Sequence, residues 1–149
     1  PAVSLVFYIR KELKQKDFPI YVLAQVVGGL IGVFLTHYIF NIQILQVSQN
    51  VRGEIPLLVS EIIATTGLLL TILFIRKSDS PSVALGVALF ISAGYWFTSS
   101  TSFANPAVTI ARIFTDTFTG IAPVSVKFFI TGQIIGCLLA NYIFNLFDE

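Results

Sequence analysis

The stretch Thr101–Thr109, with the sequence TSFANPAVT, decides the fold. Asn is a favoured helix N-cap, and Pro is favoured at the first helical position. Asn105 and Pro106 therefore predict that a helix starts here. The stretch lies inside residues 80–111, which contain no Asp, Glu, Lys or Arg and have their most polar residues in the middle.

Residues 80–111 are apolar enough for a membrane but too long for one span. We expect a full span from Pro81 to about Thr98, then a re-entrant loop and a half-helix from Pro106 to about Asp116. Such a half-helix covers about 16 Å of a hydrocarbon core about 30 Å thick. Its N-terminus would lie near the bilayer midplane, where free backbone N–H groups are tolerated only against protein or a water-filled path.

The first residues of the chain repeat this element. Residues 1–4 (PAVS) match residues 106–109 (PAVT), and charge follows an apolar run in both places. At an offset of 104 the similarity continues through two pairs of glycines and the tetrapeptide YIFN, which occurs at 38–41 and 142–145. Because three full spans separate the two half-helices, the copies would be inverted and their N-termini would meet at mid-membrane. Inverted repeats with broken helices are an architecture of membrane transport proteins.

The two motifs resemble those of the aquaporin and glycerol-facilitator family. The residues that carry the resemblance are Pro1, Ala2 and Val3 in the first motif, Asn105, Pro106 and Ala107 in the second, and the segment EIIAT at 61–65. The family has six spans and two half-helices, with one pore in each subunit of a homotetramer. The resemblance implies a fragment that lacks the first two spans and the Asn of the first motif.

The resemblance also implies the domain organisation. Residues 1–149 would form a single, N-terminally incomplete aquaporin-like channel domain, with 1–41 as the end of the first repeat and 55–149 as the second repeat.

Composition independently indicates an integral membrane chain. Hydrophobic residues make up 55% of the 149 residues, charged residues 11%, and the mean hydropathy is +0.84. We expect an all-α membrane fold with four full spans, at 18–40, 55–75, 81–98 and 124–147, plus two re-entrant half-helices. The net charge of +1 gives no case for nucleic acid, and a single cysteine excludes an internal disulfide or a cysteine metal cluster. No cofactor is expected.

Glycine and histidine positions in the spans carry further expectations. Gly28 with Gly32, and Gly132 with Gly136, have the spacing that lets helices approach closely. His37, at the end of the first full span, is expected at the membrane interface.

The positive-inside rule predicts the orientation. One side of the membrane would hold Arg10, Lys11, Lys14, Lys16, Arg76 and Lys77, and the other only Arg52, Arg112 and Lys127. The first side, which includes the C-terminus, is therefore expected in the cytoplasm. The resemblance is to a bacterial branch of the family, which implies the inner membrane.

Among function classes, a passive channel is favoured. General acid and base catalysis needs two titratable groups in reach of one substrate, and those inside the membrane are essentially Glu61, with His37 near an edge. Two alternatives stay open: an ion-coupled secondary transporter, which would be expected to keep several intramembrane charges, and a truncated fragment that does not conduct. The resemblance implies that Glu61 braces a loop carrying one of the motifs, as opposed to carrying coupled protons.

In the family the outer constriction is formed by an Arg three residues after the second motif's Asn and by residues three and twelve before it. Counted here, these positions are Val108, Ser102 and Ala93, with Gly94 as the alternative if the alignment slips by one. With neither Arg nor His, the filter should be wide and should pass water, glycerol, urea and neutral metalloid acids. Arg112 lies one helical turn beyond Val108 and is expected to face lipid headgroups, with the outer vestibule as the alternative.

Overall fold

The computed structural model describes residues 1–148, and these residues form helices, turns and irregular segments without a strand. The helices are α1 (Ala2–Ile9), α2 (Phe18–Ile39), α3 (Ile55–Ser78), α4 (Val83–Phe97), α5 (Pro106–Ala111) and α6 (Val126–Leu146), with 3₁₀ turns at Ser80–Ser82, Arg112–Phe114 and Pro123–Ser125. Four helical segments are long and apolar enough to cross a membrane, and the all-helical membrane prediction is therefore confirmed.

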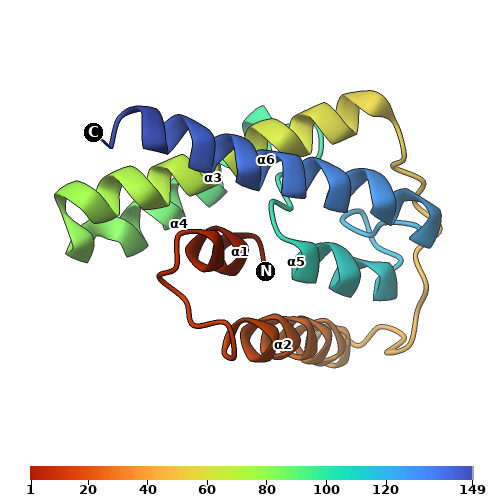
Figure 1. The fold of residues 1–149 in the computed structure, drawn as a ribbon. Coiled ribbons are helices and arrows are strands. Elements are labelled where there is room, and N and C mark those ends of the chain that lie inside the picture. The colour runs from red at the N-terminus through yellow and green to blue at the C-terminus, as the bar shows by residue number, and fades with distance from the viewer. Residues whose placement is uncertain (149) are drawn as a thin grey trace.

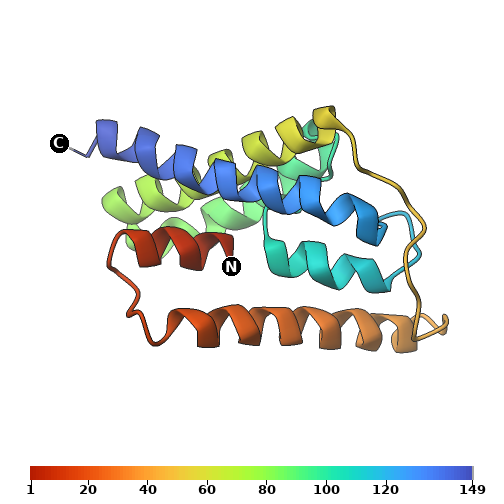
Figure 2. The ribbon, with the colours of Figure 1, turned by 45° about the vertical axis from the view of Figure 1, so that its right-hand side comes forward.

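The helices form three layers. In Figures 1 and 2, α3, α4 and α6 lie together on one side, α2 lies on the other, and the short helices α1 and α5 lie between them. Figure 2 shows α1 and α5 end to end, with their N-termini facing each other and their C-termini pointing to opposite ends of the molecule. The layered arrangement therefore brings two helix starts, residues 1–2 and 105–106, toward the centre of the bundle.

Helix α5 is shorter than the sequence predicts. The α-helix ends at Ala111 and a 3₁₀ turn continues it to Phe114, short of the expected Asp116. The cause lies in the backbone hydrogen bonds, because the carbonyls of Arg112 and Ile113 accept from Ile121 N (3.2 Å) and Ser48 N (2.8 Å). These bonds tie the end of the half-helix to the loops that follow it and precede α3.

Glycines bring α6 close to α3. A Cβ on Gly132 would lie 2.7 Å from the Leu58 carbonyl oxygen, and one on Gly136 would lie 2.8 Å from Thr65 Cβ. These two glycines therefore pack as predicted, on the face where the two helices make their most extensive contact.

The matching glycines of α2 do not pack in this way. A Cβ added to Gly28 or Gly32 would meet no atom within 4 Å, so the prediction for this pair is wrong within the described residues. Helix α2 instead approaches α5 through Gly29, where an added Cβ would lie 3.2 Å from Ala111 Cβ. The reason is that no described helix packs against the Gly28–Gly32 face of α2, whereas α3 packs against the matching face of α6.

One end of the bundle is charged. Arg10, Arg76 and Lys77 form ion pairs there with Glu12 and Asp148, so the 10–17 linker, the α3–α4 turn and the C-terminal segment meet at the same end. The positive-inside count likewise placed these three segments on one side of the membrane.

Candidate functional site

The loop that enters α5 has an unusual backbone. Thr101, Ser102 and Ala104 have φ values of 61°, 49° and 47°, in the left-handed region that side chains other than glycine rarely adopt. Each such residue costs of order 1 kcal/mol or more, so the conformation persists only if surrounding contacts determine it. Those contacts come from α3, α6 and the segment before α3.

Glu61 on α3 supplies the largest part of this support. Its fully buried carboxylate accepts from Phe103 N at Oε1 (2.9 Å) and from Ala104 N at Oε2 (2.9 Å). Gln133 Nε2 on α6 also donates to Oε2 (2.6 Å) and to Thr109 Oγ1 on α5 (2.8 Å). All three partners of Glu61 are N–H donors, which match the acceptor oxygens of its carboxylate. Glu61 therefore joins α3 and α6 to the loop that leads into α5.

Arg52 supports the start of the same loop. Its Nη2 donates to the Ser100 carbonyl (2.7 Å), and its guanidinium lies over the Phe103 ring, 5.1 Å from the centroid. Burial lowers the pKa of Arg52, and the nearby charge of Arg112 lowers it further, whereas Glu61 raises it. Arg52 thus fixes the start of the loop at Ser100, and Glu61 fixes its end at Phe103 and Ala104.

The cap of α5 leaves polar groups free. Asn105 Oδ1 accepts from Ala107 N (2.9 Å), as an N-cap side chain should. Among the described residues, no hydrogen bond uses Asn105 Nδ2 or the carbonyl oxygens of residues 102–104. The loop and the helix start therefore present two amide hydrogens and three carbonyl acceptors that other groups can use.

Residues 102–105, which carry these groups, line a cavity of about 140 Å³. Its lining comes from α3, α4, the re-entrant loop and α5, and comprises Leu68, Ile91, Tyr95, Ser102, Phe103, Ala104, Asn105, Val108 and Arg112. The structure thus brings together Ser102, Asn105 and Val108, which belong to the second motif and the predicted filter. It adds Ile91, Tyr95 and Phe103, which the motif does not predict; the spacing of four between Ile91 and Tyr95 is the signal that the sequence offers.

Ala93 does not line this cavity and is exposed. On α4 it lies midway between Ile91 and Tyr95, about 200° around the helix from each, so its side chain points the other way. Gly94 is the buried residue that meets Ser102: a Cβ there would lie 2.8 Å from Ser102 Oγ. The alternative alignment, with Gly94 in place of Ala93, fits this contact.

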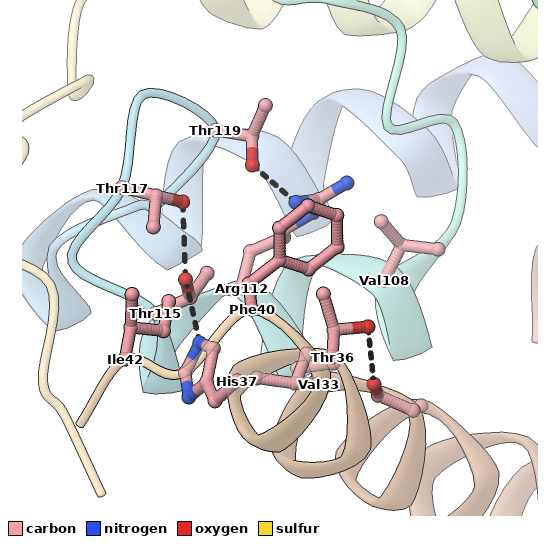
Figure 3. Close-up of a pocket in the computed structure, with 13 residues that line it drawn as sticks. Val33, Thr36, His37, Phe40, Ile42, Val108, Arg112, Thr115, Thr117 and Thr119 are labelled. Carbon is pink, nitrogen blue, oxygen red and sulfur yellow. Dashed lines mark hydrogen bonds between the residues drawn. The ribbon is translucent and has the colours of Figure 1, made fainter. Parts of the chain in front are cut away.

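A second cavity, of about 690 Å³, lies between α2 and α5 (Figure 3). It shares Val108 and Arg112 with the first cavity, so these two side chains stand between the two spaces. Arg112 Nη1 donates to Thr119 Oγ1, in the loop after the half-helix. The expectation that Arg112 faces lipid headgroups is therefore wrong, because the Thr119 hydrogen bond turns its guanidinium toward the cavities.

His37 is buried instead of interfacial. Only 2% of the residue is exposed, and its ring nitrogens pair with the Ile44 carbonyl (2.8 Å) and Thr115 Oγ1 (3.0 Å). The segment after α2 folds back over the end of this helix, which covers the side chain. His37 thus fastens that segment to the loop after α5, and Figure 3 shows its ring beside Thr115 at the edge of the larger cavity.

The first motif lies beside the second motif's loop. Ala2 is buried against α6, and Val3 packs against the apolar cluster that contains Ala104. Pro1, Ala2 and Val3 do not line either cavity. Pro106 and Ala107 form the first turn of α5, with Ala107 buried.

Metal chemistry has no candidate here, since the described residues contain no group of three or more His, Cys, Asp or Glu side chains that could hold an ion.

Comparison with curated proteins identifies a relative. The chain is 44% identical over 140 residues to aquaglyceroporin AqpS of Rhizobium meliloti (strain 1021). The alignment covers 94% of this chain and 60% of the relative, so the chain spans about three fifths of that protein's length. No family model matches the chain, and no solved structure matches it.

Proposed function

Because this chain belongs to the aquaporin family, we propose that it forms part of a passive transmembrane channel for water and small uncharged solutes. Glycerol, urea and neutral metalloid acids are the solutes in question. The observation that carries the proposal is the cavity wall formed by Asn105 and residues 102–104, because the Asn105 amide hydrogens and the carbonyl oxygens of 102–104 have no partner among the described residues. Such a wall can replace the hydrogen bonds that a hydroxylated solute or water loses on leaving bulk solvent.

The mechanism follows from the position of the half-helices. Each helix start has a partial positive charge of about half an elementary charge, and α1 and α5 direct these ends at each other. Cations are repelled at this point. A water molecule that accepts from Asn105 Nδ2 is held with its hydrogens pointing away, which hinders a proton relay, while neutral solutes pass down their gradient.

We assign the outer constriction to Ser102, Val108 and the α4 residue that faces Ser102. Val108 stands where the family has an Arg, and Gly94 leaves room for the Ser102 hydroxymethyl group. An apolar residue of medium size, a serine and a glycine make a constriction wider than one closed by a guanidinium group. This favours solutes of glycerol size over water alone.

The coupled-transporter alternative is weaker because of Glu61. A residue that carries coupled protons must exchange them with a path, whereas the Glu61 carboxylate is fully buried and occupied by three N–H donors. We therefore assign Glu61 to bracing the loop and assign no catalytic residue.

The proposed setting is a homotetramer in a bacterial inner membrane, with the C-terminus in the cytoplasm. Residues 1–41 would be the end of the first repeat and 55–149 the second repeat of one channel domain. The lipid bilayer and the permeating solutes are the partners, and neither a cofactor nor nucleic acid is involved.

Stopped-flow swelling of proteoliposomes tests the proposal. Vesicles containing the product of the complete reading frame should swell in isosmotic glycerol, urea and arsenous acid faster than empty vesicles, with water permeability also raised. Parallel vesicles with the 149-residue chain alone test whether this part conducts. Uptake that requires a proton gradient, without passive swelling, would contradict the channel and favour the transporter.

A further inference from the structure

Val108 and Arg112 occupy successive turns of one helix face. The Arg112 N–H donates to the Val108 carbonyl, an α-helical i to i−4 bond, so the side chains lie one above the other. The rise along the helix places Arg112 about 6 Å farther from the start of α5 than Val108. A guanidinium group is thus present near the constriction, but one turn farther out than the filter position.

The Arg112 guanidinium is held over the pathway. Nη1 donates to Thr119 Oγ1, and Cζ lies 5.9 Å from the Phe103 ring centroid. The backbone is fixed as well, because the Arg112 carbonyl accepts from Ile121 N (3.2 Å). Figure 3 shows the side chain extended above the larger cavity, bonded to Thr119, with Val108 farther along the same helix. Arg112 therefore borders both cavities in a defined orientation.

The charge of Arg112 is not cancelled locally. Within residues 1–148, the ion pairs join Arg10, Arg76 and Lys77 to carboxylates at the other end of the bundle, and none includes Arg112. The titratable side chains close enough to interact with it are Arg52, which is also a cation, and Tyr95. Arg112 therefore places a positive charge at the outer end of the pathway that has no ion-pair partner within residues 1–148.

We propose that Arg112 is a specificity-determining residue that supplies the fixed positive charge at the outer mouth. The charge disfavours cations one helical turn before the constriction, while Val108 leaves the constriction itself open to larger neutral solutes. This inference rests on the proposed channel function. With the charge at Arg112 and the width at Val108, the constriction can be wide while the outer mouth still repels cations.

The potential at the constriction can be measured directly by thiol modification. Val108→Cys is introduced in the product of the complete reading frame, and its reaction rates with a cationic methanethiosulfonate (trimethylammonioethyl) and an anionic one (sulfonatoethyl) are compared. A unit charge about 6 Å away changes each rate about threefold in opposite directions in water, so Arg112→Gln should lower the anionic-to-cationic rate ratio about tenfold. Low ionic strength, about 10 mM, keeps screening small.

Two control variants separate local from general effects. Arg112→Lys keeps the charge and should keep the ratio, and Lys127→Gln removes one charge from the same end, outside both cavity linings, and should leave the ratio unchanged. The protein without Val108→Cys is the blank for both reagents, and Cys137 should not contribute to it because this residue is 1% exposed. Size-exclusion profiles of every variant establish that it is folded.

The outcomes distinguish the inference from the function on which it rests. A ratio that is equal with Arg112 and with Gln at that position, or that falls as far in Lys127→Gln, would overturn the role of Arg112. Glycerol swelling of vesicles with the unmodified protein is measured in parallel. If glycerol does not pass, the channel proposal fails whatever the rate ratio; if glycerol passes and the ratio does not move, only the inference fails.

Discussion

Replacing Glu61 by Gln should destabilise the protein by about 2–4 kcal/mol, because the new side chain has one oxygen where the carboxylate has two. Either Phe103 N or Ala104 N is then left facing an NH₂ group. A buried N–H without an acceptor costs about 1–3 kcal/mol, and the bond of the other loop N–H changes from charged to neutral, which weakens it by about 1 kcal/mol. The loss falls on a loop that already contains three left-handed residues.

Gln133 limits this cost. Its Oε1 atom is buried without a partner, so its amide can turn over and accept from the new NH₂ group, provided that the Thr109 hydroxyl also turns and donates to Gln133. The bond between residues 61 and 133 then survives, and the loop N–H bears the loss. We therefore expect neutral-solute flux to fall without disappearing in Glu61→Gln.

Thr65→Val is the matched control. Thr65 lies one turn along α3, is equally buried, and its Oγ1 has no hydrogen-bond partner. Removing an unpaired hydroxyl at constant shape should be nearly neutral. The free energies of unfolding of the two variants are compared by SDS titration in mixed micelles. Equal costs would refute the bracing role, and a selective loss of proton-coupled uptake with unchanged stability would assign Glu61 to a transporter.

Two further predictions concern packing and pH. Gly136→Ala should lower the free energy of unfolding by about 1–3 kcal/mol in the same titration, since the new Cβ would lie 2.8 Å from Thr65 Cβ. Gly28→Ala in the 149-residue chain should cost far less, because a Cβ there meets nothing within 4 Å. Equal costs would contradict the close α3–α6 contact. Burial raises the pKa of Glu12, but the hydrogen bonds to Arg76 and Arg10 outweigh burial, and the pKa in the folded protein lies below 4.5. The stabilisation by Glu12 is therefore present above pH 4.5 and is lost as the pH falls through the lowered pKa. The melting temperatures of the unmodified chain and Glu12→Gln should therefore converge on acidification, and a constant difference down to pH 3 would be contrary to this.

Much of the fold could be predicted because membrane spans are strong signals in a sequence. Length and hydropathy located the four spans, and the cap at Asn105 located the half-helix, since both signals are local. Glu61 could be assigned to a backbone partner because an unpaired charge within a span costs about 3 kcal/mol or more.

What the sequence could not supply depends on contacts between distant segments. The burial of His37 and the orientation of Arg112 are set by partners 78 and 7 residues away, Thr115 and Thr119, which periodicity does not reveal. Counting back from Asn105 left Ala93 and Gly94 as alternatives, because an irregular loop separates the two helices, and it is Gly94 that meets Ser102. Packing of Gly28 could not be judged either, since glycine spacing does not say whether a neighbour is present.

The central claim is that a wide constriction at Val108 admits solutes larger than water, and Val108→Arg tests it most directly. In stopped-flow swelling of proteoliposomes that contain the product of the complete reading frame, the variant should lose most of its glycerol and urea permeability and keep its water permeability. The reason is that a guanidinium group fills the space that Val108 leaves open beside Ser102. An unmodified protein that passes water but excludes glycerol, urea and arsenous acid alike would contradict the account.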